Sequence, residues 1–102
     1  MRLADTPVLC LLAGRSPRWP KLRRLWLRSN PTCAACGRLK FAQVHHVVAV
    51  HLNRSLELAW SNLMTLCEGG GCNHHLEVGH LGNWQDINSS ARELAAKMLA
   101  GG

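Results

Sequence analysis

A chain of 102 residues has room for one domain, whose core is small because a short chain buries only about two-thirds of its surface on folding. It carries 12 Lys and Arg against 6 Asp and Glu, a formal net charge of +6 with neutral histidines. The apolar run at residues 7–14 is far shorter than the roughly twenty residues that cross a bilayer, so we expect no membrane span and a cytoplasmic protein.

The positive charge is concentrated in one segment. Eight of the 12 basic residues lie between Arg15 and Lys40, and no acidic residue interrupts them. A surface of this charge gains affinity for nucleic acid by displacing counterions from the phosphates. DNA, RNA and an acidic protein fit the charge equally well, and a basic helix face that only contacts solvent is the alternative.

Residues 1–14 are expected to form an N-terminal arm, and a helix is predicted over residues 20–29. Trp19, Leu22 and Trp26 recur at helical spacing and form its apolar side. A basic stripe follows the other side of the same helix and consists of Lys21, Arg24 and Arg28. The tryptophans are interpreted as core residues, and Arg24 and Arg28 as candidate contacts to a DNA backbone.

The rest of the chain predicts two short strands and two more helices. The Val-rich run at residues 42–50 and the run at 63–67 are typical of strands. Asn73 is a plausible N-cap for a helix over residues 73–78. A capping box opens the last helix, over residues 90–100.

Four cysteines form two closely spaced pairs. Cys33 and Cys36 make one turn, and Cys67 and Cys72 make another. Two such turns supply four thiolates to a tetrahedral Zn²⁺, with Zn–S distances of about 2.3 Å, which predicts a closed structural site. Two disulfides or unreacted buried thiols are the alternatives. The odd residue, Cys10, is interpreted as a buried free thiol.

The histidines also occur as pairs. His45 and His46 lie in the first predicted strand, and His74 and His75 begin the helix that follows the second cysteine pair. Adjacent residues on a regular strand point to opposite faces, so His45 and His46 can serve one site only at a strand end or a local twist. A histidine-rich surface is the alternative to a functional cluster.

These motifs follow one another in the order cysteine pair, histidine pair, asparagine, cysteine pair and histidine. In that order the chain resembles the HNH endonuclease family, whose core is the ββα-metal motif or His-Me finger. The resemblance covers residues 32–86, and the wider run over 15–84 resembles the short HNH proteins of phages and prophages. The matching segments are TCAACG at 32–37, VHHV at 44–47, SNLMTLCE at 61–68 and NHHLEVGHLGNW at 73–84.

The resemblance implies an α+β fold in which residues 1–102 form one nuclease domain around a zinc-clamped ββα-metal core. His45 matches a ligand of the catalytic divalent metal, and His46 matches the general base that activates water. Asn62 matches the asparagine that orients the base and holds the loop between the strands. His75 matches the second metal ligand, and the four paired cysteines match the zinc site.

One departure from the family pattern leaves an alternative open. The family has its ligand histidine directly after the last cysteine, whereas two residues separate Cys72 from His75 here. His74 therefore remains an alternative to His75. His80 is not expected to be a ligand, because five residues correspond to about 140° around an α-helix.

The implied activity is hydrolysis of DNA phosphodiester bonds, by nicking or double-strand cutting, with Mg²⁺, Mn²⁺ or Ni²⁺ as the catalytic ion beside the structural Zn²⁺. The resemblance also suggests a monomer or weak dimer that assists DNA packaging with a phage terminase, in the cytoplasm of a bacterial host. A non-catalytic zinc module that binds DNA or RNA, and an assembly adaptor, are the competing interpretations.

Overall fold

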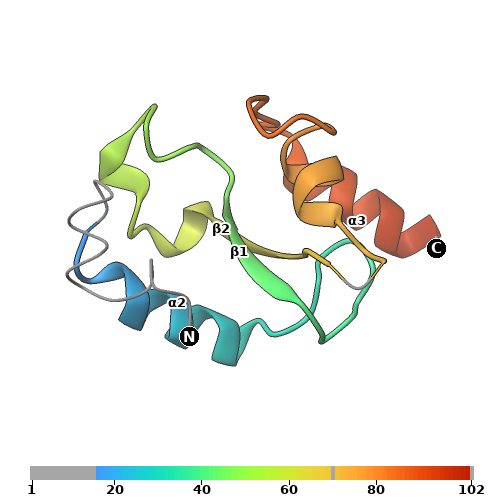
Figure 1. The fold of residues 1–102 in the computed structure, drawn as a ribbon, viewed down its shortest axis with the longest axis horizontal. Coiled ribbons are helices and arrows are strands. Elements are labelled where there is room, and N and C mark those ends of the chain that lie inside the picture. Colours follow the sequence, from blue (N-terminus) through green and yellow to red (C-terminus); the bar gives the residue numbers. More distant parts are fainter. Residues whose placement is uncertain (1–15, 70, 102) are drawn as a thin grey trace.

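The computed structural model describes residues 16–69 and 71–101 (Figure 1). The predicted N-terminal arm and Cys10 lie outside the described residues. The elements are α2 (Trp19–Ser29), β1 (Ala42–His46), the 3-10 turns η2 (Arg54–Leu56) and η3 (Trp60–Asn62), β2 (Leu63–Cys67), η4 (His75–Gly79), which is a π-helix, and α3 (Ala91–Gly101). In this part of the chain, no helix is long and apolar enough to span a membrane.

The centre of the fold is an antiparallel hairpin made of β1 and β2. Ala42 pairs with Cys67 at one end, and His46 pairs with Leu63 at the other. Every residue of β2 is buried, so both faces of this strand must be covered by other elements. The register places the histidine pair at the far end of the hairpin from Cys67.

Helices cover the two faces of the hairpin (Figure 1). On one face α2 packs Trp19 and Trp26 against Leu63, and the Trp26 indole N–H donates to Thr65 Oγ1 at 2.9 Å. On the other face η4 and α3 pack against β2, with Val78 of η4 in the buried cluster. The hairpin is therefore the middle of three layers, as amphipathic elements that bury one face each require.

The α+β fold class is confirmed, and most element boundaries agree with the predicted ones to within a residue. One exception is the helix predicted over residues 73–78, which is a π-helix over His75–Gly79. The other is the first strand, which ends at His46 although the Val-rich run continues to Val50. The reason lies in Asn62, whose side-chain amide bonds both the N–H and the C=O of Val48. Because these backbone groups are satisfied by a side chain, they do not extend the ladder.

Candidate active site

Three histidine side chains meet between β1 and η4. The candidate ligand atoms of His45, His75 and His80 all lie within 4.8 Å of one another, and the ring centroids are 4.9–5.1 Å apart. The expectation that His80 points away from His75 is wrong, because it assumed α-helical geometry. The segment is a π-helix, whose i→i+5 hydrogen bonding brings residues five apart onto one side.

The hydrogen bonds of these rings indicate which nitrogen of each neutral ring carries the proton and which carries the lone pair. His75 Nδ1 lies 2.8 Å from Glu68 Oε1, and His80 Nδ1 lies 2.9 Å from the Asp86 carbonyl oxygen. Both oxygens are acceptors, so each Nδ1 carries the proton and each Nε2 keeps its lone pair. His45 Nε2 is buried and has no hydrogen-bond partner among the described residues. Such a nitrogen is costly to bury unless an ion or water satisfies it.

His45 is held as a neutral imidazole. His45 is only 4% exposed, and this burial lowers the pKa of its imidazole from 6.5 to about 3. The neighbouring rings of His75, His80 and His46 lower this pKa further. A neutral imidazole is the form that binds metal ions. Three imidazoles, one of them with an orphaned buried nitrogen, therefore form a donor set that fits a divalent transition-metal ion.

Gly79 makes room for the ring of His45. A Cβ at this position would lie 2.8 Å from His45 Cε1 and 3.0 Å from both ring nitrogens. In the structure, the absence of a side chain allows η4 to approach β1 closely enough for His75 and His80 to reach His45.

His46 lies on the opposite side of β1 from His45, as strand geometry predicts. Its ring packs against Trp19 of α2 at a centroid distance of 4.6 Å, and its Nε2 donates to the Glu57 carbonyl oxygen at 2.8 Å. This bond makes Nδ1 the acceptor nitrogen of the neutral ring. Because His46 ends the strand, it still lines the same cavity as His45. The volume of this cavity is about 840 Å³.

Asn62 connects the end of the hairpin to the loop that precedes it. Its Oδ1 accepts from Val48 N–H at 2.8 Å, and its Nδ2 donates to Val48 O at 2.9 Å and to Leu56 O at 3.3 Å. The loop is thus held on both sides of its tip. Since Glu57 follows Leu56 directly, Asn62 also fixes the carbonyl that binds His46.

The cysteines form a second cluster, at the other end of the hairpin. The ligand atoms of Cys33, Cys36, Cys67 and His74 all lie within 4.8 Å of one another, and Cys72 Sγ lies 3.6 Å from Cys36 Sγ. The four cysteines therefore come together as predicted. Burial raises the pKa of the Cys36 thiol. Bound Zn²⁺ would lower the pKa of the thiols, because it holds them in their deprotonated form. The positions of the ligand atoms are compatible with a structural zinc.

His74 joins the cysteines and not the other histidines. Its Nδ1 lies 3.7, 3.4 and 3.2 Å from the sulfur atoms of Cys33, Cys67 and Cys72. The group that could hold a metal ion consists of Cys33, Cys36, Cys67 and His74, and Cys72 is joined to Cys67 by a disulfide. Two backbone hydrogen bonds between Gly69 and Cys72 fold this loop back and bring the two cysteines together.

Residues 33–79 match the family model of the HNH endonucleases. This segment belongs to the HNH endonuclease family. The match begins at Cys33 and ends at Gly79, so His80, α2 and α3 lie outside it. An HNH endonuclease domain implies metal-dependent nuclease activity with DNA as the substrate. The comparisons with curated proteins and with solved structures gave no match.

Besides His80, the cavity is lined by further polar and aromatic side chains to which the sequence assigned no role. Arg54 and His51 come from the loop between the strands, and Trp84 comes from the loop after η4. The ring of Trp84 is 49% exposed and lies 5.1 Å from the ring of His75 and 5.0 Å from that of His80. The only signal available in the sequence was their position between, or directly after, the matching motifs.

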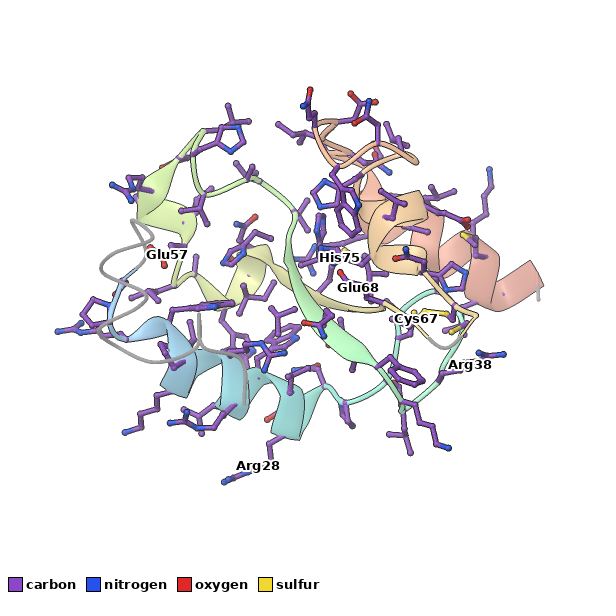
Figure 2. The ribbon with its side chains drawn as sticks, viewed as in Figure 1. Arg28, Arg38, Glu57, Cys67, Glu68 and His75 are labelled. Atoms are coloured by element: carbon purple, nitrogen blue, oxygen red, sulfur yellow. A yellow bond between two sulfur atoms is a disulfide. The ribbon has the colours of Figure 1, made fainter. Side chains whose placement is uncertain are left out.

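Arg24 and Arg28 are exposed on α2, across the hairpin from the histidine cluster. Figure 2 shows Arg28 pointing outward from α2, whereas His75 lies on the other side of the hairpin. The structure therefore does not bring the two predicted DNA contacts together with the cavity of the HNH domain.

Proposed function

We propose that this protein is a DNA endonuclease that hydrolyses phosphodiester bonds at the histidine cavity. His45, His75 and His80 hold its catalytic divalent ion. The observation that supports this most directly is the convergence of three imidazoles, with the buried Nε2 of His45 lacking a hydrogen-bond partner among the described residues. Two neighbouring groups, Glu68 and the Asp86 carbonyl, orient the other two rings.

The ion, once bound, supplies positive charge to the phosphate and to the departing 3′ oxygen. Three imidazole ligands leave positions open for phosphate and water, and they favour Mn²⁺, Co²⁺, Ni²⁺ or Zn²⁺ over Mg²⁺, which prefers oxygen ligands. We therefore expect Mn²⁺ or Ni²⁺ to support cleavage better than Mg²⁺ at equal concentration.

His46 is the proposed general base. Because its Nε2 donates to the Glu57 carbonyl, Nδ1 is the nitrogen of the neutral ring that would accept the proton of the attacking water. A neutral imidazole accepts a proton in this role, and the same carbonyl stabilises the imidazolium that forms. Asn62 is a positioning residue, because it holds the loop that carries this carbonyl.

DNA contacts are proposed at the cavity wall. Arg54 and His51 line the same cavity as the histidine cluster, and side chains of these types bind phosphate oxygens. Arg24 and Arg28 remain proposed backbone contacts, on a separate face that a bent or second DNA segment reaches. One site cuts one strand at a time, so double-strand cleavage requires two events or a dimer. The partnership with a phage terminase remains a prediction from the resemblance.

The cysteine cluster is proposed to hold a structural Zn²⁺ in its reduced form. Cys33, Cys36 and Cys67 supply three thiolates, and Cys72 or His74 supplies the fourth donor. The disulfide between Cys67 and Cys72 and this zinc shell are alternative states of the same sulfur atoms. A thiolate site of this kind contributes directly to folding in small domains.

A non-catalytic zinc module that binds nucleic acid is the second candidate. It accounts for the cysteines and the net charge, but not for the histidine cavity. Plasmid nicking and DNA binding by the wild type, His46→Ala and the surface control Lys97→Gln separate the two. The nuclease predicts that His46→Ala loses about 10² to 10⁴ in rate while DNA binding and the control are unchanged. DNA binding without cleavage by the wild type at any metal concentration would favour the module, whereas equal cleavage by wild type and His46→Ala would refute the role of His46 as the base.

A further inference from the structure

We propose that Glu68 is a positioning residue for the catalytic metal and that its place is fixed by the cysteine cluster. This inference rests on the proposed function of the histidine cavity. It concerns a carboxylate that the family resemblance does not assign and that neither contacts DNA nor reacts. Its role is to set how tightly the histidines bind their ion.

The direct contact is the bond from His75 Nδ1 to Glu68 Oε1, 2.8 Å long. The two side chains are 18% and 29% exposed, so this pair is partly shielded from water. A carboxylate in this position fixes the ring orientation and the tautomer, and it raises the basicity of the opposite nitrogen. For His75 that opposite nitrogen is Nε2, the proposed ligand atom.

Two neighbouring residue pairs connect the histidine cluster to the cysteine cluster. In the first pair Cys67 faces the cysteines and Glu68 faces His75; in the second His74 faces the cysteines and His75 faces His45. Figure 2 shows Cys67, Glu68 and His75 next to one another.

The backbone fixes Glu68 further. Its N–H donates to the Phe41 carbonyl at 2.8 Å, directly beyond the last ladder pair of the hairpin. Glu68 is therefore held by the hairpin on one side and by the neighbouring metal-binding cysteine on the other. A carboxylate fixed in this way is preorganised for His75, whereas an ordinary surface ion pair contributes little and leaves affinity unchanged.

The test is the dissociation constant of Mn²⁺ for reduced protein loaded with one equivalent of Zn²⁺, measured by calorimetry without DNA. The variants are Glu68→Gln and Glu68→Ala, and the matched control is Glu77→Gln, an exposed carboxylate on η4. We expect Glu68→Ala to weaken Mn²⁺ binding by about 10- to 100-fold. Glu68→Gln should weaken it less, because its amide oxygen still accepts from Nδ1–H, and the control should stay within about twofold.

Zinc content and Tm are measured on the same samples. The proposal is supported if both Glu68 variants bind Mn²⁺ more weakly than the wild type, if Glu68→Ala loses more affinity than Glu68→Gln, and if both retain their zinc. If Glu68→Ala lowers Tm, the Mn²⁺ affinity of Glu68→Gln, at a Tm equal to that of the wild type, decides whether Glu68 positions the metal site. Wild-type affinity in both variants overturns the role of Glu68 alone, whereas a wild-type protein that binds no Mn²⁺ overturns the proposed catalytic site as well.

Discussion

Replacing Gly79 with alanine places a methyl carbon against the ring of His45. The added Cβ would lie 2.8 Å from Cε1, and an ordinary contact begins at 3.4 Å, so the ring or η4 must move by roughly 0.6 Å. Neither moves easily, because His45 is buried and lies against both His75 and His80. Overpacking of this kind costs about 1–3 kcal/mol. Metal–ligand distances tolerate only about 0.2 Å, so the donor set should lose its geometry.

The assay is Mn²⁺ binding and plasmid nicking by Gly79→Ala beside Gly101→Ala. Gly101 is a matched control, since a Cβ there meets nothing within 4 Å. We expect Mn²⁺ affinity to fall at least about tenfold in Gly79→Ala, following the usual cost of misplaced ligands, and nicking to fall with it. Wild-type affinity in Gly79→Ala would refute the argument that close approach of η4 to β1 builds the site.

Three further predictions follow from the same structure. The folded pKa of His45, about 3, lies below its unfolded value of 6.5, so unfolded chains take up a proton that the folded protein cannot. Stability should therefore be complete above pH 6.5 and fall by up to about 1.4 kcal/mol per pH unit below it, and urea denaturation of zinc-loaded protein should give a flatter pH profile for His45→Gln; parallel profiles would contradict this. Asn62→Ala removes three hydrogen bonds and should lower the free energy of unfolding by about 2–4 kcal/mol, together with nicking activity; a fully stable, fully active variant would be the contrary result. Zinc content should approach one ion per chain after reduction and fall after oxidation of Cys67 and Cys72, because thiolates and not a disulfide bind zinc; equal zinc content in both states would exclude these sulfurs as ligands.

The hairpin and the cysteine cluster could be predicted from the sequence because their signals are local. A run of β-branched residues predicts β1, and the spacing within each cysteine pair predicts a metal-binding turn. The opposite placement of His45 and His46 also follows from strand geometry alone. What ended β1 early was a tertiary contact, the amide of Asn62 on Val48, which no local pattern reports.

The third histidine of the cavity could not be predicted for a related reason. Helical periodicity assumes 3.6 residues per turn, and it turns His80 away from His75. The last residue of the π-helix, Gly79, packs on His45, which lies more than thirty residues earlier in the chain and is a contact that no local pattern reports. The basic stripe on α2 shows the same limit, since its sequence predicts exposed arginines but not which side of the hairpin they occupy.

The central claim is that the three histidines hold an ion with which the protein cleaves DNA. The most direct test is nicking of supercoiled plasmid by zinc-loaded protein with added Mn²⁺ or Ni²⁺, beside His45→Ala, His80→Ala and an EDTA control. The account predicts nicked circles for the wild type alone, with loss of cleavage in EDTA and in both variants, including the histidine outside the family match. Cleavage that survives the loss of either histidine, or its absence in a wild type that binds the ion, would contradict it.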